Sequence, residues 1–195
     1  MSRPEKAALP DPCLPCLSMN NNCQGLHIRA AIAEDAVPLT RISFASKSYW
    51  NYPQVYYKAW SAELTITPDY IANSHVFVAM HEAAAIGYYA VVHRRQQQPA
   101  HGIILEKGFW LEHMFVVPEH IGCGVGTRLV QHLKGYCLDR RIRRLAVLAD
   151  PHALGFYEKC GFSYQREVAS TIAGRSTPLL ILQTHRCSGS EKSPV

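Results

Sequence analysis

A run of alternating glycines constrains this chain more than any other feature. Gly122, Gly124 and Gly126 lie between an apolar stretch that ends at Val117 and a helical pattern that begins near Thr127. Glycine reaches backbone conformations closed to other residues, so the peptide N–H groups of such a loop can converge on one point. A helix that starts there adds the positive end of its dipole. The segment therefore predicts a loop that binds a diphosphate.

Other glycine-rich phosphate loops fit this segment less well. A dinucleotide-binding loop has the pattern G-x-G-x-x-G and an acidic residue about 20 residues later. This chain has G-x-G-x-G instead. A mononucleotide loop continues with Lys and then Ser or Thr, whereas here Thr127-Arg128 follows the last glycine. Nucleotide hydrolysis is therefore not expected, and a tight strand-to-helix turn of small residues stays open as the simplest alternative.

The sequence after the loop predicts a unit of helix, strand and short helix. Apolar residues recur at roughly helical spacing over 127–138, and 143–149 has the character of a short β-strand. A short helix is then opened by Asp150, which is suited to cap it, with Pro151 at its first position. Gly161 is placed to end that helix.

With these elements the chain resembles the GNAT superfamily of acyl-CoA-dependent N-acetyltransferases. The resemblance rests on Val117-Pro118 with the glycine loop, on the spacing to Ala153 and Phe156-Tyr157, and on the closing run 159–162. It covers roughly residues 26–185 and implies an α/β GNAT fold. In that fold a mixed central β-sheet of order βααβββαβαββ carries helices on both faces, and its fourth and fifth strands splay apart into a cleft.

The residues before the loop supply the earlier elements of that order. A break is expected at Pro68, a bulge at Gly87 and a solvated loop over 94–102. The predicted elements are a strand at 26–31, helices at 34–46 and 54–65, paired strands at 75–80 and 85–93, and a long strand at 108–117.

The resemblance implies acetyl-CoA as cosubstrate, and no metal cofactor is expected. Its pantetheine arm would pair with the backbone of Phe115 and Val117, and the loop amides would hold the pyrophosphate. Ile121 replaces the family's usual Arg or Gln, so backbone amides must suffice. His152 replaces the usual Asn, and it either donates a hydrogen bond or is a solvated helix-terminal residue. The predicted cofactor-binding residues are Phe115, Val116, Val117, Gly122, Cys123, Gly124, Val125, Gly126, Thr127, His152 and Phe156.

Tyr157 and Glu112 are the candidates for the proton transfers of catalysis. Tyr157 occupies the position where the family presents a phenol to the departing sulfur, and an ordinary phenol stays protonated at neutral pH. Glu112 is the candidate base, because strand alternation places it on an apolar face with Met114 and Val116, opposite His113. Burial there would raise its pKa. The alternatives are a packing role for Tyr157, and for Glu112 an exposed carboxylate or one paired with His113.

The acceptor is less well determined. In the family the first two helices and their connection wall the acceptor site, and here that connection is rich in aromatic residues that include Trp50 and Tyr52. With Glu112 they predict a site for an apolar or cationic acceptor that uses cation–π contacts. Core packing between the helices explains the aromatic residues equally well. We expect a primary amine, on a small molecule, as acceptor; a non-catalytic acyl-CoA sensor and a transferase for protein N-termini or lysines remain alternatives.

Composition sets the outer limits of the prediction. Residues 25–186 are expected to form one domain between flexible tails at 1–24 and 187–195. The net charge of +5 includes no long basic tract, and no apolar run suits a signal peptide or membrane span, so neither nucleic acid nor a membrane is an expected partner. Cys13 and Cys16 lack a second pair at matching spacing, which argues against zinc. The odd number of cysteines, seven, fits free thiols in the cytoplasm, and a homodimer is compatible with the sequence.

Overall fold

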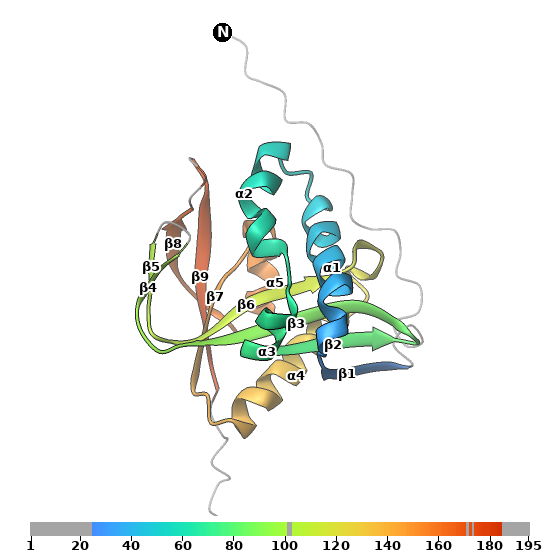
Figure 1. The fold of residues 1–195 in the computed structure, drawn as a ribbon. Helices are drawn as coiled ribbons and strands as arrows, with labels where there is room; N and C mark the ends of the chain where they lie inside the picture. The colour runs from blue at the N-terminus through green and yellow to red at the C-terminus, as the bar shows by residue number, and fades with distance from the viewer. Residues whose placement is uncertain (1–24, 101–102, 171, 173, 185–195) are drawn as a thin grey trace, which may run out of the picture.

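The fold is built on a mainly antiparallel sheet with helices on both faces (Figure 1). The computed structural model describes residues 25–100, 103–170, 172 and 174–184. Within these residues a seven-stranded sheet has the order β1-β2-β3-β6-β7-β9-β8. Its strands are β1 (Leu26–Ala30), β2 (His75–His81), β3 (Ala84–Arg94), β6 (Gly108–Val116), β7 (Arg144–Leu148), β8 (Ser163–Ala169) and β9 (Ser176–Gln183).

The helices complete the predicted order of elements. They are α1 (Ala36–Ser48), α2 (Gln54–Leu64), α3 (Pro68–Asn73), α4 (Val125–Asp139) and α5 (Leu154–Lys159). The predicted order βααβββαβαββ is confirmed, with α3 and a small β4–β5 hairpin added to it. Pro38 lies in the first turn of α1, where its missing N–H leaves no intrahelical bond unmade.

The predicted splay is present between β6 and β7. These strands are parallel and pair at Phe109 with Leu145, Trp110 with Ala146, and Leu111 with Val147. Beyond Leu111, β6 continues to Val116 paired with β3 alone, and β7 is held by β9. The facing edges of β6 and β7 are therefore left open beyond that point.

Separate hydrophobic cores lie on the two faces of the sheet. α4 and α5 cover one face through residues such as Leu129, Leu133 and Tyr157. α1 and α3 cover the other face through residues such as Leu39 and Ile71. The opening between β6 and β7 therefore lies between two layers of helices.

The segment after β3 differs from the prediction. A solvated loop was expected over 94–102, but β4 (Gln98–Ala100) and β5 (Ile103–Leu105) pair as a hairpin. Leu105 is buried with Trp110, so this apolar residue anchors the hairpin against the sheet. The prediction of a loop was therefore wrong for Gln98–Ala100, although residues 95–98 are exposed as expected. The polar, proline-containing start of the segment hid the pairing with the short apolar run that follows.

Pro68 begins a helix as well as marking a break. α2 ends at Leu64, close to the predicted end, and Pro68 is then the first residue of α3. The side chain of Thr67 caps α3 by accepting a hydrogen bond of 3.0 Å from the Tyr70 amide. Proline is favoured at this first position because its N–H would have no helical acceptor.

The predicted bulge at Gly87 is confirmed. The β2–β3 register shifts between Ala79 and Met80, which pair with Gly87 and Ala85. A Cβ at Gly87 would lie 2.9 Å from the carbonyl oxygen of Phe115 on β6. Glycine is therefore required for β3 and β6 to approach this closely.

The ends of the chain carry predictions that the structure does not reach. The tails at 1–24 and 187–195 lie outside the described residues, and so do Cys13 and Cys16. No helix in the described part of the chain has the length and apolar character needed to cross a membrane. Nor do these residues bring together three His, Cys, Asp or Glu side chains that could hold a metal ion.

The close approach at Gly87 leads to a stability prediction. Gly87→Ala should lower the free energy of unfolding by about 1–3 kcal/mol, because the added methyl group meets a backbone oxygen. Gly135→Ala is the matched control, since its Cβ would meet none of the described atoms within 4 Å. In the middle of α4 it should stabilise by about 0.5–1 kcal/mol. Urea unfolding followed by circular dichroism measures both, and equal stability of Gly87→Ala and wild type would contradict the argument.

Candidate functional site

The glycine loop joins β6 to α4 at the open edge of the sheet. A 3₁₀ turn at Pro118–His120 follows β6, and α4 then begins at Val125. Gly124 stands just before α4 with φ = 85°, a left-handed conformation that favours glycine. Gly124, at the N-cap position, has no side chain that could accept a hydrogen bond from the amides of the first turn. An anion is the partner that such an end favours.

The predicted cofactor residues of α4 and α5 lie against each other. A Cβ at Gly126 would lie 3.2 Å from the Phe156 ring, so the absence of a side chain lets α5 pack against the loop. Val125 is buried in the core, whereas Gly122, Gly124 and Thr127 are exposed and Cys123 is half-buried. The structure thus brings the loop and Phe156 together at one end of the cleft.

The backbone of β6 corrects one part of the prediction. The amide of Val117 donates a hydrogen bond of 2.9 Å to Ile86, so it points towards β3. Successive peptide groups along a strand point to opposite edges, so Phe115 also faces β3, whereas Met114 and Val116 face the open edge. The expectation that the backbones of Phe115 and Val117 face the splay was therefore wrong by one residue, whereas the backbone of Val116, also predicted to bind the cofactor, does face it. Met114, which was missed, faces it too.

Tyr157 is buried in the core on the α4 and α5 face of the sheet and does not line the charged pocket described below. Its ring is 5.3 Å from that of Phe156 and 5.1 Å from that of Phe162, measured between centroids. Burial raises the pKa of Tyr157, and the charges of Cys160 and Asp150 add to the shift. The phenol therefore stays protonated at neutral pH, as a proton donor must.

Glu112 lies on the face opposite to the one predicted. The β3–β6 register shifts between Ala90, which pairs with His113, and Val91, which pairs with Leu111. Glu112 is the extra residue of this bulge, so simple alternation fails there. Its carboxylate accepts hydrogen bonds from Tyr70 at 2.8 Å and from Arg94 at 2.5 Å. The prediction of an apolar face shared with Met114 and Val116, and opposite His113, was therefore wrong.

His113 shares the aromatic surroundings of Glu112. It is buried, with its ring centroid 5.4 Å from that of Tyr70, which also holds Glu112. Burial and the charge of Glu112 raise the pKa of Tyr70, so its hydroxyl remains a donor to that carboxylate. The bulge thus brings both residues to Tyr70 of α3.

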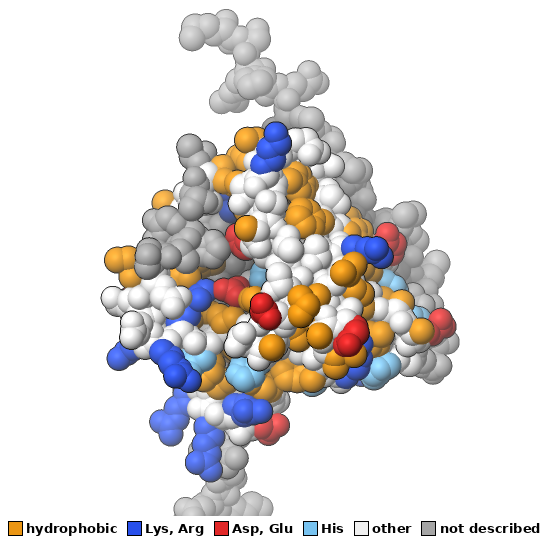
Figure 2. Space-filling model, viewed as in Figure 1, with side chains coloured by type: hydrophobic (Ala, Val, Ile, Leu, Met, Phe, Trp, Pro, Cys, Tyr) orange, Lys and Arg blue, Asp and Glu red, His pale blue; other side chains and the backbone are white. Residues whose placement is uncertain are grey.

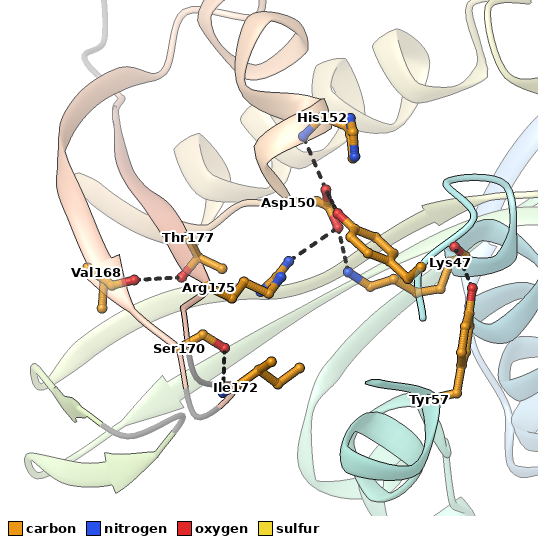
Figure 3. Close-up of polar contacts among 10 residues, drawn as sticks. Lys47, Tyr57, Asp150, His152, Val168, Ser170, Ile172, Arg175 and Thr177 are labelled. Atoms are coloured by element: carbon orange, nitrogen blue, oxygen red, sulfur yellow. Dashed lines mark hydrogen bonds and ion pairs between the residues drawn. The ribbon is translucent and has the colours of Figure 1, made fainter. Parts of the chain in front are cut away.

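Asp150, at the end of β7, joins three distant segments (Figure 3). One carboxylate oxygen lies 2.7 Å from Lys47 Nζ of α1 and 3.6 Å from Arg175 of the β8–β9 turn. The other accepts from the Tyr52 hydroxyl at 2.7 Å and from the His152 amide at 3.1 Å. Burial alone would raise the pKa of Asp150, but Lys47, Tyr52 and the His152 amide lower it overall.

The aromatic connection packs over this carboxylate. Lys47 Nζ lies 4.7 Å from the centroid of the Trp60 ring, and the guanidinium carbon of Arg175 lies 5.1 Å from it. The same two cations lie 5.7 and 5.6 Å from the centroid of Tyr52. Trp50 stands apart from this group and stacks on His152, with 4.6 Å between ring centroids and 2° between planes.

A charged pocket opens where β6 and β7 separate. Figure 2 shows acidic and basic side chains close together in the hollow below α2. The pocket includes the predicted Glu112 but not Trp50 or Tyr52, although Tyr52 contacts Asp150 in its wall. Its lining residues are Lys47, Trp60, Glu63, Arg94, Leu105, Trp110, Leu111, Glu112, Leu148, Ala149, Asp150, Ser170, Arg175 and Thr177.

Sequence reasoning missed the basic residues of this pocket. Lys47, Arg94 and Arg175 stand far apart in the chain, and no local spacing connects them. The one signal in the sequence was a glycine, Gly174, just before Arg175 and between two strand patterns. In the structure Gly174 has φ = 75° and turns the chain, and Arg175 lines the pocket.

The Asp150 contacts lead to a pH-dependent prediction. Asp150→Asn should lower the free energy of unfolding at pH 7 by about 1–3 kcal/mol, because it leaves Lys47 and Arg175 without their counter-charge. Since folding lowers the pKa of Asp150, its contribution exists above the ordinary carboxyl pKa and is lost as the pH falls through the lowered value. The difference from wild type should therefore shrink in acid. Urea unfolding from pH 7 to pH 3 measures it, with the exposed Asp139→Asn as control; a difference independent of pH would contradict this account.

Comparisons with known proteins place the fold. A PaiA N-acetyltransferase from Thermoplasma acidophilum in complex with coenzyme A is 16% identical, with a TM-score of 0.63 over 81% of this chain and 98% of that one. A GNAT family acetyltransferase from Brucella melitensis in complex with acetyl-CoA is 20% identical, with a TM-score of 0.53 over 83% of this chain and 89% of that one. A GCN5-related N-acetyltransferase from Rhodopseudomonas palustris is 19% identical, with a TM-score of 0.63 over 80% and 94%.

At these identities the solved structures establish the fold, and the sequence itself establishes the family. None of the curated proteins compared matches this sequence. The profile of the Acetyltransferase (GNAT) family matches residues 40–162, which is more than half of the chain and includes the glycine loop, Glu112 and Tyr157. The chain therefore belongs to the GNAT acetyltransferase family.

Proposed function

We propose that this protein transfers the acetyl group of acetyl-CoA to a primary amine of a small molecule. Membership of the family implies acyltransferase activity. The observation that carries the finer proposal is the arrangement along the splay of β6 and β7. The glycine loop and the start of α4 follow β6 at its open end, and the charged pocket lies where the pairing stops, with Leu111 and Leu148 in its lining.

The residues at the open edge fit a cofactor with an anionic head and an amide-bearing arm. Amides from Gly122 to Thr127 would hold a pyrophosphate, helped by the dipole of α4. The peptide groups of Met114 and Val116 face the opening and would pair with the amides of the arm. Acetyl-CoA, when bound, supplies an acetyl group activated as a thioester.

Tyr157 and Glu112 have the chemistry for the proton transfers. Tyr157 is protonated at neutral pH and would deliver a proton to the leaving thiolate. Glu112 lines the pocket, and its oxygens retain acceptor sites beyond the bonds from Tyr70 and Arg94, so it would receive a proton from an incoming ammonium. Alignment of amine and thioester contributes much of the rate in such a site, up to about 7–11 kcal/mol in favourable cases.

The shape of the pocket supports a small acceptor. Trp60 and Glu63 of α2 line one side, and Arg175 and Thr177 beside the β8–β9 turn line another. A protein N-terminus or lysine would need an open groove between these segments. The contacts that tie α1, Tyr52 and Arg175 to Asp150 bring them together instead.

The cofactor site can be tested by one substitution with a neutral partner. Gly124→Asp should abolish or greatly weaken binding of acetyl-CoA and CoA, because it places a negative charge beside the pyrophosphate site. Gly124→Asn has nearly the same size and the same backbone strain at φ = 85°, so it should bind more tightly than the Asp variant. Calorimetric titration measures both. Equal affinities in the two variants, or a wild-type protein that binds neither ligand, would refute this site.

The role of Tyr157 can be tested once a screen of primary amines, read by thiol release, has identified an acceptor. Tyr157→Phe should lower kcat by about 10²-fold or more, the usual range for loss of a general acid, with little change in affinity for acetyl-CoA. Tyr164→Phe, on the exposed face of β8, is the control and should leave kcat unchanged. Unchanged turnover in Tyr157→Phe would show that the ring has a packing role alone. Cofactor binding without turnover of any amine would favour a non-catalytic acyl-CoA sensor.

A further inference from the structure

At the Asp150 wall of the pocket, two cations share one carboxylate. Lys47 and Arg175 both lie against the same carboxylate, and they do so in a largely buried setting where the side chains of all three are between 11% and 14% exposed. At the other wall, Arg94 is balanced by Glu112. Within the described residues, the Asp150 group therefore contributes two cations and one anion.

Arg175 is held less closely by Asp150 than Lys47 is. Its distance of 3.6 Å to Asp150 is longer than the 2.7 Å of the Lys47 contact, so Lys47 is the closer partner of the carboxylate. A guanidinium carries five N–H donors in a planar fork, which matches a carboxylate or a phosphate. Arg175 lines the pocket, with its charged group over the Trp60 ring.

The same contacts leave little room for a cationic ligand at the aromatic wall. Trp60 and Tyr52 offer the rings that would attract an ammonium group, but Lys47 and Arg175 lie within 5.7 Å of both ring centroids. An acceptor ammonium placed there would meet two cations at short range. The wall that the sequence predicted to bind a cation is therefore one that attracts an anion.

We propose that the acceptor is an amine that also carries a carboxylate, as an amino acid does. Its carboxylate binds Arg175 beside Lys47, and its amine lies towards Glu112 on the opposite wall. The lining as a whole carries three cations and three carboxylates, a balance that suits a ligand with both an ammonium group and a carboxylate. The inference rests on the proposed acetyl transfer for the role of the amine, but the carboxylate site can be tested without any reaction.

Binding of charged probes tests the carboxylate site directly. The probes are propionate and 3-phenylpropionate, matched with propylammonium and 2-phenylethylammonium, each titrated by calorimetry into the full chain with and without CoA. Wild type should bind at least one carboxylate more tightly than its ammonium partner. Arg175→Gln should weaken that binding about tenfold, the usual scale for loss of a charge-assisted hydrogen bond, and Arg175→Lys should fall between the two. No binding of either carboxylate, or tighter binding of the ammonium probes, would overturn the proposal.

Glu63 provides a control for the charge balance. It lines the same pocket from the exposed side of α2. If Arg175 and Lys47 attract the carboxylate, Glu63→Gln removes one acidic charge from the pocket and should keep or strengthen carboxylate binding, the opposite of Arg175→Gln. Weaker carboxylate binding in Glu63→Gln would count against the proposal, because removing an acidic group from the pocket should not impair binding of an anion.

Measurements of turnover provide a second test of the carboxylate site. Amino acids, their carboxamides and their decarboxylated amines are compared as acceptors by thiol release. In wild type, kcat/KM should be at least about tenfold higher for the acid than for its amide, and Arg175→Gln should remove most of that preference. Equal use of acids and amides would overturn the inference. Acetyl-CoA titration separates the two hypotheses: cofactor binding without carboxylate binding refutes this inference alone, and carboxylate binding without cofactor binding refutes the proposed function.

Discussion

The short pairing between β6 and β7 is the constraint on which the site depends. If the parallel strands β6 and β7 stayed paired along their full length, neither would have a free backbone edge that a ligand could pair with. Here pairing stops after Leu111 and Val147, yet neither strand loses its other neighbour. The sheet therefore stays continuous at one end and opens at the other, between helical layers with separate cores. The glycine loop, Tyr157 and the charged pocket all take their positions from this opening.

Much of the fold, including the glycine loop of the candidate cofactor site, was predictable because its signals are local. The glycines, Asp150-Pro151 and the apolar spacing of α4 each act within a few residues, and each set a boundary that the structure confirms within a few positions. Gly87 also signalled a bulge by residue type alone. The bulge at Glu112 had no such signal, since it arises where β3 and β6 shift by one residue against each other. The alternation of residues within one strand does not reveal that shift, so Glu112 was assigned to the wrong face of the sheet.

The acceptor side was much less accessible to sequence reasoning because it is built from long-range contacts. Lys47 and Tyr52 precede Asp150 by 103 and 98 residues, and Arg175 follows it in a turn between two strands. The aromatic residues of the α1–α2 connection were visible in the sequence, but the cationic side chains that contact them were not. The cations that occupy their faces come partly from the far end of the domain. The sequence shows the aromatic residues, and only the fold shows the cations that lie over their rings.

The convergence of three segments on Asp150 also bears on the order in which the protein assembles. Contacts between residues about a hundred positions apart close long loops, and such loops form slowly. The local β2–β3 and β8–β9 hairpins face no such delay. The Asp150 group can form only after the sheet has aligned the end of β7 with α1 and the β8–β9 turn. The charged pocket should therefore be among the last parts of the domain to become ordered, and in native-state hydrogen exchange it should open without unfolding the sheet.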